Sequence, residues 1–468
     1  MKLFELSLLL LGSSQAALAS KLQKPLGGIA SSAISTPSLP SSSSYDNDDN
    51  NNNNNSDDDT PPPYRETLVS LHKSLIEIES ISYNETNVGH FLADYLSSLG
   101  FATELQYLPS SNSSSSSSSS LSNNNHEENQ RFNVLAWPTS ARDPHSPPQP
   151  KVLVTSHIDT APPYIPYSVS PPGTPLGPES LIAGRGSVDA KGSVAAQIAA
   201  VASLLQDGEL ENPGDVMLLY VVGEERSGDG MQAFSERVNN DNSNNNNDND
   251  GEDLAADTTT TTFKAAIFGE PTENKLVCGH KGVFGCTITA RGRAGHSGYP
   301  SLGKSATEVL MRGLVAVLDA ELGSDADFGN TTVNVGLIEG GAAPNVIAER
   351  ATAQIATRVA IGPEKGGSGI VAGRLQEVLR GVDDDAFEVG CTEGYGVVRC
   401  ACDVEGFETI TVNYGTDVPN LKGNHTRYLY GPGSILVAHG ADEAVKLKDL
   451  ETAVEDYKKL ILHALEEN

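Results

Sequence analysis

Apolar positions between residues 65 and 268 alternate between helical repeats and short continuous runs. An amphipathic helix is expected to begin near Arg65, because apolar residues recur there at helical spacing. These residues are Leu68, Leu71, Leu75, Ile76 and Ile78. Apolar runs at 151–155, 215–222 and 263–268 predict buried strands, and residues 194–205 predict a helix. Buried strands that alternate with helices are typical of a mostly parallel sheet covered on both faces.

The pattern changes near residue 283. Residues 284–290 alternate like a half-exposed strand, residues 305–322 form a helical repeat, and residues 332–338 and 351–359 predict two more strands. This strand–helix–strand–strand unit indicates an inserted α+β domain. The chain then returns to apolar runs at 409–412 and 434–437 and closes with a predicted helix over 450–465. The predicted fold class is therefore α/β, with a mostly parallel-sheet domain interrupted by a smaller α+β domain.

Three polar tracts interrupt these patterns. Residues 20–64 are rich in Ser, Pro, Asn and Asp, and we expect them to be disordered because they cannot bury enough apolar surface. The serine run at 110–120 and the Asn/Asp run at 239–253 are expected to be surface loop insertions, since loop entropy grows slowly with length.

The composition is that of a globular but acidic protein. The 468 residues are enough for about two or three domains. The chain has 31 basic and 61 acidic residues, a formal net charge of −30. The polar tracts at 46–59 and 239–253 hold eleven of these acids, so the rest still carries −19. An acidic surface argues against a nucleic-acid or an anionic-membrane partner.

The N-terminus resembles a secretory signal peptide over residues 1–19. Lys2 precedes an apolar run at 3–11 and the small-residue pattern Ala17-Leu18-Ala19. A buried N-terminal helix is the alternative. Four glycosylation sequons outside the longest polar tracts are compatible with export to the extracellular space. They begin at Asn84, Asn112, Asn330 and Asn424.

Five cysteines are too few for a disulfide scaffold, and their odd number leaves at least one unpaired within the chain. They are Cys278, Cys286, Cys391, Cys400 and Cys402. We expect core residues or one or two disulfide bonds.

Imidazole and carboxylate side chains follow several predicted strands. The segments are 156–160 (Ser-His-Ile-Asp-Thr), 184–192 (Gly-Arg-Gly-Ser-Val-Asp-Ala-Lys-Gly), 223–228 (Gly-Glu-Glu-Arg-Ser-Gly), 269–272 (Gly-Glu-Pro-Thr), 295–298 (Gly-His-Ser-Gly) and 438–440 (Ala-His-Gly). Singly, such residues can be helix caps, core histidines or solvated pairs. The first four segments, however, are expected at strand ends on one edge of one sheet, where converging carboxylates repel. A divalent cation removes that repulsion, so the sequence predicts a metal site.

The residue types indicate zinc and a division of roles. Imidazole and carboxylate ligands suit zinc, and two neighbouring ions need a bridging carboxylate. Asp189 is the expected bridge, because the glycines around it permit tight turns. Asp159 lies on the same side of an extended segment as His157 and can accept its second ring N–H. In the Glu224-Glu225 pair, one carboxylate can bind metal while the other acts as a general base.

Together these motifs, in this order, resemble the M20 family of metallopeptidases over about residues 65–465. The resemblance implies a zinc-exopeptidase catalytic domain at 65–284 and 389–468, with a lid and dimerisation domain at 285–388. It implies that a first zinc ion is held by His157, Asp189 and Glu270, and a second by Asp189, Glu225 and His439. It further implies that Glu224 is the catalytic base.

The resemblance also implies substrate contacts from the inserted domain. His296 would help to hold the substrate carbonyl, in the partner subunit's site if the chain dimerises through its lid. Asn345 and Arg358 would bind the substrate carboxylate. Family members often have an Asp two residues before that Arg, where this chain has Ala356.

The expected function is that of a secreted di-zinc hydrolase of small peptides, a metallo-carboxypeptidase. The alternative is an amidohydrolase that deacylates N-acyl amino acids, because both reactions use the same site. A non-catalytic metal-binding protein and a structural secreted protein are disfavoured, since all the catalytic residues are present and the polar tracts resemble spacers.

Overall fold

The computed structural model describes residues 60–109, 130–139, 150–244 and 263–466. The predicted signal peptide, all but the last residues of the 20–64 segment, the serine run and Asn112 lie outside the described residues. In the part of the chain that is described, no helix is both long and apolar enough to cross a membrane.

A six-stranded sheet forms the centre of the larger domain. Its order is β1 (Phe101–Tyr107), β2 (Phe132–Pro138), β6 (Val216–Val221), β3 (Val152–His157), β7 (Ala265–Gly269) and β19 (Thr426–Tyr430). The last four strands are parallel, and β1 and β2 complete one edge in antiparallel pairing. Every residue of β3, β6 and β7 is buried, as expected for parallel strands covered on both faces.

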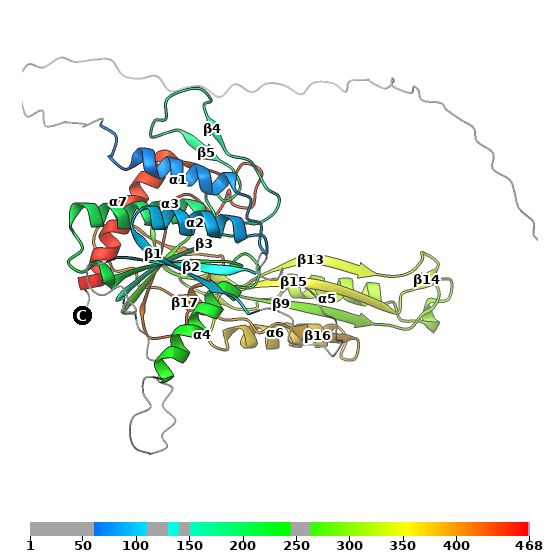
Figure 1. Cartoon of the computed structure of the whole chain (residues 1–468). Coiled ribbons are helices and arrows are strands. Elements are labelled where there is room, and N and C mark those ends of the chain that lie inside the picture. The colour runs from blue at the N-terminus through cyan, green and yellow to red at the C-terminus, as the bar shows by residue number, and fades with distance from the viewer. Residues whose placement is uncertain (1–59, 110–129, 140–149, 245–262, 467–468) are drawn as a thin grey trace, which may run out of the picture. The chain divides into compact units, whose positions relative to one another are not determined.

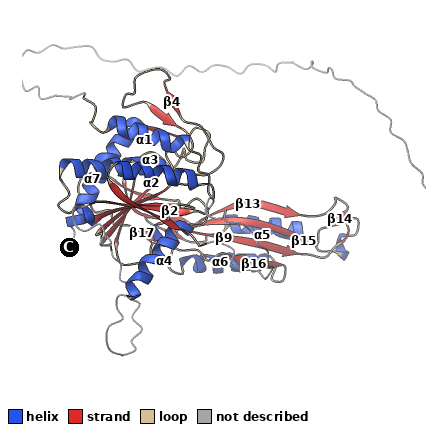
Figure 2. Ribbon diagram, in the orientation of Figure 1, coloured by secondary structure: helices blue, strands red, loops and turns tan. Residues whose placement is uncertain are grey.

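Helices and a small sheet cover the two faces (Figures 1 and 2). One face packs against α1 (Arg65–Glu77), α2 (Thr86–Ser98), α3 (Lys191–Asp207) and α7 (Leu447–Glu466). The other face packs against α4 (Asp229–Asn244) and a sheet of β17 (Val398–Arg399), β8 (Leu276–His280) and β18 (Thr409–Val412). Short 3-10 helices, η1 (Pro213–Asp215) and η3 (Val418–Asn420), occur in the connections.

A second small sheet belongs to the same domain as the central sheet. It consists of β4 (Ser168–Ser170), β5 (Leu181–Ala183) and β20 (Ala444–Lys446) in the order β20-β5-β4. Its antiparallel pairs join the segment that leads to Asp189 with the segment that follows His439.

The inserted domain has its own four-stranded antiparallel sheet, in the order β13 (Thr332–Gly340), β15 (Arg350–Val359), β9 (Gly282–Arg291) and β16 (Phe387–Cys391). The helices α5 (Ala306–Asp319) and α6 (Gly367–Val382) pack against it around a separate apolar core (Figure 2). Ser305 caps α5 by accepting a hydrogen bond from the Glu308 N–H at 3.4 Å. The remaining short elements are β10 (Gly295–His296), η2 (Pro300–Leu302), β11 (Ser324–Asp325), β12 (Gly329–Asn330) and β14 (Val346–Ile347).

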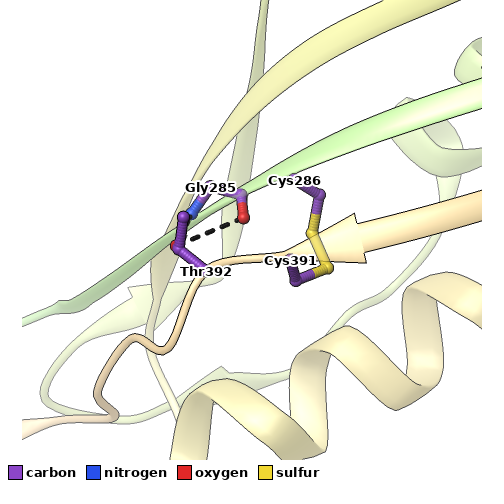
Figure 3. Close-up of a disulfide and its surroundings, with 4 residues drawn as sticks. All are labelled: Gly285, Cys286, Cys391 and Thr392. Carbon is purple, nitrogen blue, oxygen red and sulfur yellow. Dashed lines mark hydrogen bonds between the residues drawn. A yellow bond between two sulfur atoms is a disulfide. The ribbon is translucent and has the colours of Figure 1, made fainter. Parts of the chain in front are cut away.

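Two disulfide bonds join Cys278 to Cys402 and Cys286 to Cys391, and Cys400 is free. This outcome agrees with the expected one or two bonds and an unpaired residue. The second bond links β9 to β16, where Thr392 also hydrogen-bonds to the main chain of Gly285 (Figure 3).

The predicted α/β class is confirmed, with two local corrections. Residues 434–437 form turns rather than a strand, because glycines and Pro432 flank a run of only four residues. The last strand of the central sheet is instead β19, whose mixed sequence Thr-Arg-Tyr-Leu-Tyr hid it. The Asn/Asp run expected as a loop begins inside α4, which continues to Asn244.

Candidate metal centre

Four segments carry their polar side chains to one edge of the central sheet. His157 is the last residue of β3, Glu224 and Glu225 follow β6, and Glu270 directly follows β7. His439 lies in the connection after β19. Because these strands are parallel neighbours, their carboxyl ends share an edge.

Asp189 reaches this edge by a route that the sequence did not indicate. Its segment follows β5 of the small sheet rather than a strand of the central sheet, and α3 begins two residues later. Gly186 has φ +86, and a Cβ there would lie 2.8 Å from Thr160 Cγ2, so this turn requires glycine. The predicted tight turning around Asp189 therefore has a direct structural reason.

The structure assembles two groups of metal-ligating side chains that share Asp189. One group is His157, Asp189 and Glu270, and the other is Asp189, Glu225 and His439, each with ligand atoms within 4.8 Å of one another. The Asp189 carboxylate lies between them. Its Oδ1 is 3.1 Å from His157 Nε2, and its Oδ2 is 3.3 Å from His439 Nε2.

The other ligands of each group also lie within 4.0 Å of its histidine. His157 Nε2 lies 4.0 Å from Glu270 Oε1, and His439 Nε2 lies 2.9 Å from Glu225 Oε2. Glu225 Oε1 also accepts a hydrogen bond from the Ala161 N–H at 3.0 Å, which orients its carboxylate. Two sets of imidazole and carboxylate donors joined by one carboxylate fit a pair of divalent cations such as zinc.

Asp159 orients both His157 and the Glu224-Glu225 turn. We expected its carboxylate to accept the second N–H of His157, but the nearer acceptor is its main-chain carbonyl, at 2.9 Å from Nδ1, while Oδ1 is at 3.5 Å. The carboxylate accepts from the N–H groups of Glu224 at 3.1 Å and Glu225 at 3.2 Å, and from Ser82 Oγ at 2.7 Å. An Nδ1 donor leaves His157 Nε2 free to bind metal.

Several side chains at this edge favour their protonated forms. Burial raises the pKa of Glu224 well above its usual value, and the negative charge of Glu270 adds to the shift. Burial likewise raises the pKa of Glu270. Hydrogen bonds to Asp189 and Glu225 raise the pKa of His439 to about 10. A cation in this cluster would replace the protons that these groups otherwise hold.

Two residues near the cluster were not predicted as site residues. Asp417 lines a cavity of about 10 Å³ with His157, Glu224 and Glu270. Burial raises the pKa of Asp417 to about 6. The other residue is Glu443, which accepts hydrogen bonds from the Asp189 loop and lies outside the motifs described above.

The predicted substrate residues lie at two separate places on the lid. His296 pairs with Val346, and the Ser297 N–H donates to the Asn345 carbonyl, so His296 and Asn345 lie together at the β10–β14 end. The contacts found for His296 are with residues of the lid. Arg358 lies at the opposite end of β15, paired with Val283 next to the start of β9, and its Nη1 lies close to Gly415.

Comparisons with known proteins agree with the fold. Residues 278–366 match the family model described as a peptidase dimerisation domain of the M20 type, within and just before the predicted lid. A peptidase M20 domain-containing protein of Sordaria macrospora is 52% identical over 86% of each chain. A probable carboxypeptidase of Aspergillus flavus is 43% identical, over 85% of this chain and 87% of that protein. An M20 family metallo-carboxypeptidase of Sulfolobus solfataricus shares the fold, with a TM-score of 0.58 and 15% identity, over 85% of this chain and 99% of that one.

The sheet edge, its metal-ligating groups and the lid define a metal-dependent peptidase. The chain belongs to the M20 family of peptidases.

Proposed function

We propose that this peptidase is a secreted di-zinc carboxypeptidase of small peptides. The observation that carries the proposal is the pair of ligand groups that share Asp189. His157, Asp189 and Glu270 would hold one zinc ion, and Asp189, Glu225 and His439 the other. When bound, such a pair of ions supplies Lewis acidity that polarises a carbonyl and lowers the pKa of a water molecule.

Glu224 is the proposed general base. Its main-chain N–H is fixed by Asp159, and its side chain lines the same cavity as His157 and Glu270. From there Glu224 takes a proton from the attacking water and returns it to the amine that leaves. A raised pKa suits this role, because a base that works near neutral pH must also be able to hold the proton it has taken.

Arg358 is the proposed recognition group for the C-terminal carboxylate of the peptide. Its guanidinium lies beside Gly415, two residues from Asp417 in the cavity that Glu224 lines. A guanidinium matches a carboxylate in charge and in planar geometry. The curated relatives named as probable carboxypeptidases support the same specificity. In the family an Asp often stands two residues before this Arg, and here Ala356 occupies that position. Arg358 would therefore bind the substrate carboxylate without that Asp.

The lid would complete the site through a homodimer. His296 and Asn345 lie at the end of the lid that is formed by β10 and β14, away from the Arg358 end of β15. The outer face of α5 exposes Met311, Val315 and Leu318, each more than half accessible. The edge strand β13 is exposed beside them on the lid. An apolar helix face and an open strand edge are suited to association with a second copy, which would present His296 and Asn345 to the partner's site.

Several features support secretion. Two disulfide bonds are typical of proteins from oxidising compartments. The sequon residues Asn84, Asn330 and Asn424 are exposed, so each is open to glycosylation. These features agree with the signal peptide predicted at residues 1–19.

The experiment is an assay of zinc-loaded protein on matched substrates. We expect release of the C-terminal residue from N-blocked dipeptides, and a loss of at least about tenfold in kcat/KM when the C-terminal carboxylate is amidated, because Arg358 would lose its partner. Equal rates on the free acid and the amide would contradict a carboxypeptidase. Activity confined to N-acetyl amino acids would identify the deacylase instead.

A further inference from the structure

Glu443 is a fully buried carboxylate beside the metal centre. It lies four residues after His439, directly before β20, and its side chain is 0% exposed. Its Oε2 accepts a hydrogen bond from Arg185 Nη1 at 2.6 Å, and the Arg185 side chain is 2% exposed. Burying two charged groups carries a large desolvation penalty, so the groups that this pair contacts indicate its role.

The second carboxylate oxygen of Glu443 holds the loop that carries Asp189. Glu443 Oε1 accepts from the main-chain N–H groups of Gly186 at 3.0 Å, Val188 at 3.1 Å and Asp189 at 3.2 Å. Three donors that converge on one oxygen fix the backbone of this loop directly at the residue that joins the two ligand groups.

The small sheet explains how Glu443 reaches this loop. Ala444 pairs with Ala183, so β20 lies beside β5, and the Gly184 N–H donates to the Glu443 carbonyl at 3.2 Å. The register of this pair therefore places the Glu443 side chain under the turn that follows β5.

Arg185 extends the same connection to the other ligand segment. Its Nη2 donates to the main-chain carbonyl of His439 at 3.4 Å, and its Nε donates to the Pro163 carbonyl at 3.1 Å. Glu443 and Arg185 thus tie the backbone of Asp189 to the backbone of His439, although these residues are far apart in the sequence.

We propose that Glu443 is a positioning residue, which with Arg185 sets the separation of Asp189 and His439 for the cation that they share. The proposal rests on the di-zinc function above. It assigns Glu443 no contact with substrate or metal: its carboxylate acts through the main chain of the Asp189 loop.

The test compares E443Q with E451Q. Glu451 forms a bidentate pair with Arg65 between α7 and α1, so E451Q removes a carboxylate–guanidinium pair of the same kind away from the metal centre. Zinc content and apparent zinc affinity are measured by chelator competition for the wild-type protein and both variants. The melting temperature of each metal-stripped form is recorded in parallel.

We expect E443Q to bind zinc about 10–100-fold more weakly than the wild type, because residues that support metal ligands typically contribute this much. E451Q should keep the wild-type affinity. Activity of E443Q should recover as zinc is raised to saturation, because every ligand and Glu224 are intact. Zinc affinity in E443Q equal to that of E451Q, or no recovery at saturating zinc, would overturn the positioning role.

A second variant covers the case in which E443Q does not fold. R185K keeps the charge next to Glu443 but cannot also reach the His439 carbonyl as the guanidinium does, and we expect weaker zinc binding there as well. Wild-type affinity in R185K would overturn the proposal. If the wild-type protein binds two zinc ions and the variants bind them equally well, the positioning role is wrong and the proposed function stands. If the wild-type protein binds no zinc, both are wrong.

Discussion

The metal-ligating edge of the central sheet and the lid are built on different principles. At the sheet edge, charged side chains from five segments converge in a buried cluster and are oriented by Asp159 and neighbouring main-chain groups. On the lid, apolar residues of α5 remain exposed, while His296 and Asn345 contact other lid residues. The first region can assemble its chemistry within one chain. The second exposes apolar surface that is suited to association with a second subunit.

This difference predicts different losses of function in the two regions. Changes at the sheet edge should affect metal binding and the chemical step in every subunit. Changes on the lid should leave the metal content intact and should be complemented by a partner that carries the normal lid.

The largest effect is expected for D189A. Removal of the shared carboxylate should release both zinc ions together and lower kcat/KM by at least about 1000-fold, since metal stabilisation contributes several kcal/mol to the transition state. Metal analysis of the purified variant measures this outcome. One full equivalent of retained zinc would contradict a bridging role for Asp189.

E224Q should separate chemistry from metal binding. The variant is expected to keep the wild-type zinc content while kcat falls by about 100- to 10,000-fold, the usual contribution of a general base. Its control is E236Q on α4, in the same chain and outside the cluster. Normal turnover by E224Q would exclude Glu224 as the base.

H296A tests whether the lid acts across subunits. The variant should retain zinc and lose activity, and so should E224Q, when each is assayed alone. Mixing the two in equal amounts and allowing the subunits to exchange should restore about one quarter of wild-type activity, because each mixed dimer would then hold one complete site. No activity after exchange would mean that His296 acts within its own subunit or not at all.

The smallest effect concerns stability of the metal-stripped protein. The pKa of His439 is raised to about 10 in the folded state from about 6.5 in the unfolded chain. Its stabilising contribution is therefore complete below pH 6.5 and is lost as the pH rises to about 10. The raised pKa values of Glu224 and Glu270 act in the same direction, since the folded state binds more protons than the unfolded chain above pH 4.5.

Calorimetry of the chelator-treated protein should therefore show a melting temperature that falls from pH 6.5 to pH 10, with a shallower fall in H439Q. A melting temperature that rises over this interval would contradict the proton occupancy inferred for the cluster.

The sequence predicted the elements whose local pattern is unambiguous. The buried strands at β3, β6 and β7 and the amphipathic helices α1 and α7 were predictable, because their apolar residues match a single period. The central-sheet strand β19 was not, since two tyrosines, a threonine and an arginine conceal a buried strand.

The site residues likewise fall into those that the strand pattern predicts and those that it does not. His157, Glu224, Glu225 and Glu270 follow strands, so their convergence could be predicted from topology. Asp189 and Glu443 depend on the pairing of β5 with β20, which joins segments more than two hundred residues apart. Short strands such as these have no pattern that would reveal their partners.

The central proposal, that two cations share Asp189, is tested most directly by X-ray diffraction from crystals of the zinc-loaded protein, recorded on both sides of the zinc absorption edge. We predict two anomalous peaks about 3.5–4 Å apart, one beside His157 and Glu270 and the other beside Glu225 and His439. A single peak, or none between these side chains, would contradict the account.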